Sequence, residues 1–106
     1  EGVQVMAGAV IQPDTEIGPN SIINTHASID HDCCLGAHVH IAPGATLCGS
    51  VRVHDRAFIA SGATVIQGCS VEEDAVVGAG SVLVRDLGAG LIFLGSAALK
   101  NAGPSK

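Results

Sequence analysis

Large apolar residues recur at every sixth position over most of the chain. Starting at Val5, fourteen consecutive positions of one frame hold Val, Ile or Leu. A second column, two residues before each of these, holds only small or β-branched side chains. Residues two apart on a strand face the same side, so each unit predicts a short strand with two inward residues, followed by a corner. The large column comprises Val5, Ile11, Ile17, Ile23, Ile29, Leu35, Ile41, Leu47, Val53, Ile59, Val65, Val71, Val77 and Leu83.

Three such units close a triangle, which is the hexapeptide pattern of a left-handed parallel β-helix with eighteen residues per coil. Gly44, Gly62 and Gly80 recur at that same interval and are expected to stack at one corner, where left-handed backbone geometry favours glycine. We predict an all-β domain over residues 1–84 with a little over four coils. The frame fails at Ala89, so residues 85–106 are expected to form a short C-terminal cap, as a turn, a strand and a tail.

Composition and charge narrow the class of protein. The 106 residues suffice for one domain. A net charge of -5 with only five Lys and Arg argues against a nucleic-acid groove. No apolar run is long enough for a membrane span and no N-terminal segment reads as a signal, so the four cysteines are expected to be free thiols in the cytoplasm. The start at Glu1 suggests a processed chain or a fragment.

The stretch SIDHDCCLGAH, residues 28 to 38, carries the densest candidate chemistry. Ile29 belongs to the inward column, so the next three residues, including His31 and Asp32, occupy a corner and face out of the core. One coil later the chain has Gly49, which leaves the space beside the imidazole open. His40 lies on another edge of the prism and is expected to meet His31 only across an interface between chains.

Three segments carry a more specific resemblance: INTHASIDHDC, HIAPGATLCG and IASGATVIQG. From about Gly8 to Leu83 the chain resembles the C-terminal domain of the sialic acid O-acetyltransferase and UDP-4-amino-sugar N-acetyltransferase family. Members are acetyl-CoA-dependent trimers of left-handed β-helices. The resemblance implies a homotrimer that uses acetyl-CoA as co-substrate and needs no metal. It also implies a small acceptor, a sugar or nucleotide sugar, and neither a nucleic-acid nor a membrane partner.

The resemblance also implies roles for individual residues. His31 would be the general base that takes the acceptor's proton, and Asp32 would orient the ring and raise its basicity. The backbone amide of Gly49 would stabilise the oxyanion of the intermediate. Transfer would be direct, without an acyl-enzyme. Three further positions match residues of the family that bind the coenzyme: His40 for acetyl-CoA, and the backbone at Ser61 and Ala79 for its pantetheine and nucleotide portions. Asn24 is a separate and weaker candidate for positioning a polar group near His31.

The chain also departs from this family. The usual N-terminal, Rossmann-like nucleotide-sugar-binding domain is absent from this sequence, which leaves the acceptor open, as well as the choice between O- and N-acetylation. In LGSAALK, residues 94 to 100, Ala97 and Leu99 stand where the family usually has Pro and a basic residue. The apolar outward positions Ala60, Ile66 and Val84 suit a trimer interface.

Two other functions compete with an acyltransferase. The pair His26 and His31 invites comparison with trimeric β-helix carbonic anhydrases, which hold zinc with three histidines. The third ligand of that family lies two coils before the pair, which here would precede residue 1. A non-catalytic prism is the other alternative, either a scaffold or an ice-binding surface. The outward rows contain no T-x-T array of the kind that ice binders display.

Overall fold

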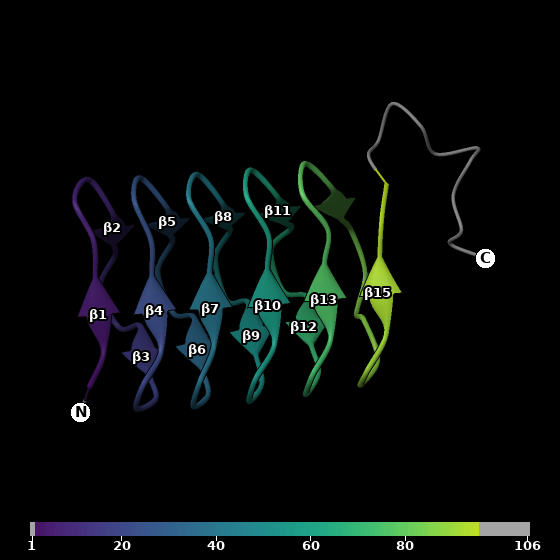
Figure 1. The fold of residues 1–106 in the computed structure, drawn as a ribbon, viewed down its shortest axis with the longest axis horizontal. Coiled ribbons are helices and arrows are strands. Elements are labelled where there is room, and N and C mark those ends of the chain that lie inside the picture. Colours follow the sequence, from purple (N-terminus) through teal and green to yellow (C-terminus); the bar gives the residue numbers. More distant parts are fainter. Residues whose placement is uncertain (1, 96–106) are drawn as a thin grey trace.

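The protein folds into a three-sided prism of stacked coils (Figure 1). The structure, a computed structural model, describes residues 2–95; Ala97 and Leu99 therefore lie outside the described residues. In Figure 1 the chain rises along the front strands, crosses the top to the back and returns below while advancing from the N- to the C-terminal end, so the β-helix is left-handed. All pairings between strands are parallel, as predicted.

Each face of the prism is one parallel sheet of two-residue strands. The first sheet contains β1 (Gln4–Val5), β4 (Ile22–Ile23), β7 (His40–Ile41), β10 (Phe58–Ile59), β13 (Val76–Val77) and β15 (Ile92–Phe93). The second contains β2 (Val10–Ile11), β5 (Ser28–Ile29), β8 (Thr46–Leu47), β11 (Thr64–Val65) and β14 (Val82–Leu83). The third contains β3 (Glu16–Ile17), β6 (Cys34–Leu35), β9 (Arg52–Val53) and β12 (Ser70–Val71).

The inward column forms the core and fixes the register. Ile23, Ile41, Ile59 and Val77 stack along the first sheet with each side chain fully buried. Partners in neighbouring coils are eighteen residues apart, as in the pairing of Ile41 with Ile59. A shift by one residue would turn every apolar side chain outward, so the hexad pattern allows only this register.

The corners need a backbone that few side chains tolerate. Gly44, Gly62 and Gly80 have φ of 73°, 70° and 69°, which confirms the glycine corner predicted from their spacing. The other corners place polar residues in the same left-handed region, among them Asp32 at 61° and Asp74 at 61°. Asn and Asp occupy this region more readily than most non-glycine residues, which accounts for Asp14, Asn20, Asp32 and Asp74 at these corners but not for Arg56 or Ser50.

The β-helix continues beyond Ala89, where the six-residue frame breaks. Leu87 bridges Val71 and Phe93 pairs with Val77, so this last coil contains sixteen residues between partners instead of eighteen. The tighter turn is completed by Asp86, whose carboxylate accepts a hydrogen bond from the Ser70 N–H at 2.8 Å. Leu87 takes the inward place that the frame would give to Ala89, and it is 7% exposed.

The outer surface differs in one respect from the expectation. Ile66 and Val84 are 37% and 56% exposed, but Ala60 is only 9% exposed, so its description as an apolar surface residue is wrong. Ala60 lies in a column between Ala42 and Gly78 of the neighbouring coils. No helix of the described residues is long and apolar enough to cross a membrane.

Candidate active site

The corner between the second and third sheets presents His31 to solvent. The turn follows β5, whose Ile29 is fully buried and anchors it. Asp30 accepts a hydrogen bond from the His31 N–H at 2.7 Å through its side chain, which fixes the start of the turn. The His31 side chain is 57% exposed, so the structure confirms that this histidine faces out of the core.

The imidazole of His31 is held by the carboxylate that follows it. Nδ1 lies 2.9 Å from Oδ2 of Asp32, close enough for a hydrogen bond in which Nδ1–H donates. This hydrogen bond, and next the negative charge of Asp30, raise the pKa of His31 above its ordinary value. Nε2 is then the nitrogen that is free to accept a proton.

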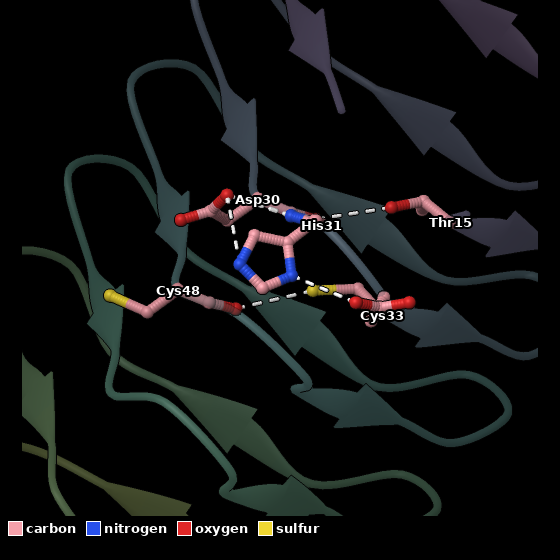
Figure 2. A network of polar contacts seen from close by, with 6 residues as sticks. Thr15, Asp30, His31, Cys33 and Cys48 are labelled. Atoms are coloured by element: carbon pink, nitrogen blue, oxygen red, sulfur yellow. Dashed lines mark hydrogen bonds and ion pairs between the residues drawn. The ribbon is translucent and has the colours of Figure 1, made fainter. Parts of the chain in front are cut away.

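A second carboxylate lies beside that free nitrogen. Oδ1 of Asp30 is 4.0 Å from Nε2 of His31, and Figure 2 shows Asp30 next to the ring with Thr15 nearby. Thr15 donates a hydrogen bond to the Asp30 backbone carbonyl at 3.1 Å, which ties this turn to the preceding coil. Sequence reasoning placed Asp30 at the corner but gave it no role, although its position directly before His31 was the available signal.

Gly49 lies next to the same imidazole. A Cβ at position 49 would stand 3.2 Å from Cε1 and 3.3 Å from Nε2 of His31, closer than side-chain carbons usually come. The backbone N–H of Gly49 donates no hydrogen bond to any residue that the structure describes. A backbone N–H without a partner, one coil from the imidazole, is the kind of donor that an oxyanion site uses.

The other predicted residues gather on a different face. Asn24 Nδ2 lies 3.4 Å from Nε2 of His40, on the first sheet. The His40 ring also contacts Phe58 edge to face, with centroids 5.1 Å apart. Asn24 therefore contacts His40 and not His31 within one chain. Phe58 was not singled out from the sequence.

Ser61 and Ala79 occupy the corner between the first and second sheets, one coil apart and both exposed. The Ser61 carbonyl already accepts a hydrogen bond from the Gly80 N–H at 2.9 Å. The structure thus brings together His31, Asp32 and Gly49, and separately Asn24 with His40. Between residues 2 and 95, no three His, Cys, Asp or Glu side chains converge closely enough to hold a metal ion.

Comparison with known proteins agrees with this fold. Residues 1–31 match the family described as bacterial transferase hexapeptide (six repeats). One similar structure is a mutant of perosamine N-acetyltransferase from Caulobacter crescentus in complex with CoA and GDP-perosamine. The two sequences are 43% identical and the TM-score is 0.83; the match covers 89% of this chain and 48% of the Caulobacter chain. The acetyltransferase domain of PglB from Neisseria gonorrhoeae FA1090, in complex with acetyl coenzyme A, is 41% identical with a TM-score of 0.87, covering 88% and 45%.

A curated relative extends the similarity. GDP-perosamine N-acetyltransferase of Escherichia coli O157:H7 is 37% identical over 59 residues, which are 50% of this chain and 27% of that protein. The chain therefore spans about half the length of the solved relatives and about a quarter of this curated one. In fold and over the matched part of its sequence, the chain is therefore similar to hexapeptide-repeat acetyltransferases.

Proposed function

We propose that this chain is the coenzyme-binding β-helix of an acetyl-CoA-dependent sugar acetyltransferase. The observation that carries the proposal is the assembly of three features at one corner: an exposed His31, its hydrogen bond to Asp32, and the unpaired amide of Gly49 against the ring. Solved relatives in complex with CoA, acetyl-CoA and GDP-perosamine support the same substrates for this chain. Because the relatives from Caulobacter crescentus and Escherichia coli are named N-acetyltransferases of perosamine, an amino sugar, we favour an amine acceptor over the hydroxyl of a sialic acid.

The residues fit a direct transfer. The acceptor amine attacks the thioester carbonyl carbon, and Nε2 of His31 takes a proton from the attacking nitrogen. The Gly49 N–H hydrogen-bonds the oxygen that gains negative charge in the tetrahedral intermediate. The intermediate collapses by breaking the carbon–sulfur bond, and the imidazolium returns its proton to the leaving thiolate. Asp32 stabilises the imidazolium during the time that the proton resides on His31.

We further propose that a complete site forms between two copies of the chain. The His31 group and the Asn24–His40 group lie on different edges of one prism, so a single chain offers only half of the predicted contacts. Side-by-side association of parallel prisms brings the His31 edge of one copy to the His40 face of its neighbour. A cyclic trimer repeats this contact three times and leaves no half-site unmatched.

The test is thiol release from acetyl-CoA in the presence of nucleotide-linked amino sugars. We expect His31→Gln to lower turnover at least a hundredfold while acetyl-CoA affinity stays within about twofold, because the base acts on the acceptor's proton. His38→Gln, an exposed corner histidine on another edge, is the matched control and should keep full turnover. A folded wild-type protein that neither binds acetyl-CoA nor releases thiol would overturn the proposal in favour of a scaffold.

A further inference from the structure

One cation shares the edge that carries His31. The corner between the second and third sheets repeats every eighteen residues as Pro13, His31, Gly49 and Gln67, and Arg85 lies in the next, shortened corner, between Leu83 of β14 and Leu87. Register along the second sheet holds up to this rung, because Val65 pairs with Leu83 and the Ile66 N–H donates to the Leu83 carbonyl at 2.9 Å. At about 4.8 Å per rung, Arg85 lies roughly 10 Å beyond Gly49 and roughly 14 Å beyond His31, toward the C-terminal end.

The backbone of Arg85 is anchored although its side chain is exposed. Leu83 and Leu87 on either side are 1% and 7% exposed, so both flanking residues are fixed in the core. The carboxylate of its neighbour Asp86 accepts a hydrogen bond from the Ser70 N–H at 2.8 Å and so forms part of the tight turn. Among the described residues Arg85 forms no ion pair, since every ion pair between them involves His31, His54 or Arg56.

The other described cations are placed or engaged elsewhere. Arg56 donates two hydrogen bonds to Asp74, at 2.9 and 3.1 Å, and lies 3.6 Å from Glu73. Arg52 projects from β9 on the third sheet, between Cys34 and Ser70 of the neighbouring coils. In a protein of net charge -5, Arg85 is thus the described cation that lies on the His31 edge without a partner of its own among these residues.

Coenzyme A has a matching separation between its reactive end and its charges. Its pantetheine arm is comparable to four or five peptide units, so it spans roughly 15 Å between thiol and pyrophosphate when extended. With the thioester at Gly49, an extended arm along this edge toward the C-terminal end reaches about 5 Å past the backbone of Arg85, which is within reach of a long arginine side chain. Arginine binds phosphate through paired N–H donors that keep their charge at all working pH values.

We propose that Arg85 binds a phosphate group of coenzyme A and so sets the direction in which the coenzyme lies on the β-helix. This inference rests on the proposed function, since it takes the thioester to be at Gly49. It assigns the phosphates to the C-terminal end of the His31 edge and the thiol to the coil of Gly49. The role concerns binding of the coenzyme and is separate from the chemistry at His31.

The experiment measures binding of coenzyme A, dephospho-coenzyme A and uncharged pantetheine by titration calorimetry to the whole 106-residue chain. We expect Arg85→Ala to lower the affinity for coenzyme A about tenfold or more and to leave the affinity for pantetheine unchanged. Arg85→Lys should recover part of the loss because the charge remains. Arg52→Ala, an exposed arginine on another face, is the matched control and should bind coenzyme A normally.

Comparison of the ligands shows which phosphate of coenzyme A contacts Arg85. Comparison of the variants separates failure of this inference from failure of the proposed function. If wild-type protein binds both coenzymes equally and Arg85→Ala weakens both, the contact is with the pyrophosphate; a loss confined to coenzyme A assigns the 3′-phosphate. Undiminished coenzyme A binding by Arg85→Ala, or an equal loss of pantetheine binding, overturns the role of Arg85 while the proposed function stands. Absence of coenzyme A binding by folded wild-type protein overturns both.

Discussion

Gly49 lies so close to His31, one coil away, that a Cβ at position 49 would come within 3.2 Å of the imidazole. Its φ is not in the left-handed region, so alanine fits the backbone there. The obstacle is the ring, which has to shift by a few tenths of an ångström or more. Glycine at position 49 therefore allows the His31 ring to stay where it is, and the backbone of the turn does not require it.

Gly49→Ala should reduce acetyl transfer about tenfold or more with little change in melting temperature, because displacement of the base costs rate without opening the core. The matched control is Gly88→Ala, whose added Cβ would lie 3.3 Å from Cδ1 of Leu91, the end of a flexible and exposed side chain. Steady-state kinetics and thermal unfolding separate the two effects. Full activity in Gly49→Ala would show that ring position at this site does not limit the reaction.

The charge on Asp32 sets the pH dependence. A carboxylate beside the ring stabilises the imidazolium, so the pKa of His31 is raised and the ring stays protonated to higher pH. Only the neutral ring accepts a proton, so kcat/KM should rise with pH through a pKa above about 6.5. In Asp32→Asn the acidic limb of the kcat/KM profile should move to lower pH, and kcat/KM at the high-pH plateau should fall.

Asp74→Asn is the control for this pH profile, because Asp74 pairs with Arg56 on another corner. It removes the same charge from the protein but should leave the acidic limb in place. Kinetics between about pH 5 and 9 with a fixed acceptor provide the measurement. An unshifted limb in Asp32→Asn would mean that another group, and not His31, titrates in the reaction.

Two inactive variants should complement each other if the site spans two copies. His31→Gln retains an intact His40 face, and His40→Ala retains an intact His31 edge. In randomly mixed trimers each contact has about one chance in four of joining two intact halves, so mixing should restore about a quarter of wild-type turnover. Activity measured after subunit exchange, against each variant alone, is the test. No recovery in confirmed mixed trimers would place the whole site within one chain.

A buried hydroxyl should contribute measurably to stability. Ser21 is fully buried, accepts a hydrogen bond from the Val39 N–H at 3.0 Å and donates one to the Gly36 carbonyl at 2.9 Å. Ser21→Ala leaves both groups without this partner, so the free energy of unfolding should fall by about 1–3 kcal/mol. Denaturant unfolding measures the loss, with the half-buried Ser28→Ala as control. An equal loss in both variants would contradict the assignment.

The six-residue recurrence of apolar side chains determined the fold from the sequence alone. A period of six with paired inward positions has one economical solution, three short strands per turn, and the resulting register places Ile29 in the core and His31 outside it. The glycine corner followed in the same way, because Gly44 and its equivalents need a positive φ that most residues avoid. These are local constraints, repeated in every coil.

Other features depend on contacts that no repeat encodes. The closeness of Gly49 to the imidazole, the 4.0 Å approach of Asp30 to Nε2, and the hydrogen bond of Asp86 to Ser70 arise from side-chain rotamers and from a shortened coil. A hexad frame gives the height and face of a residue but not the direction of its side chain. Tertiary structure decided those directions, because packing between rungs selects one rotamer among those that the backbone allows.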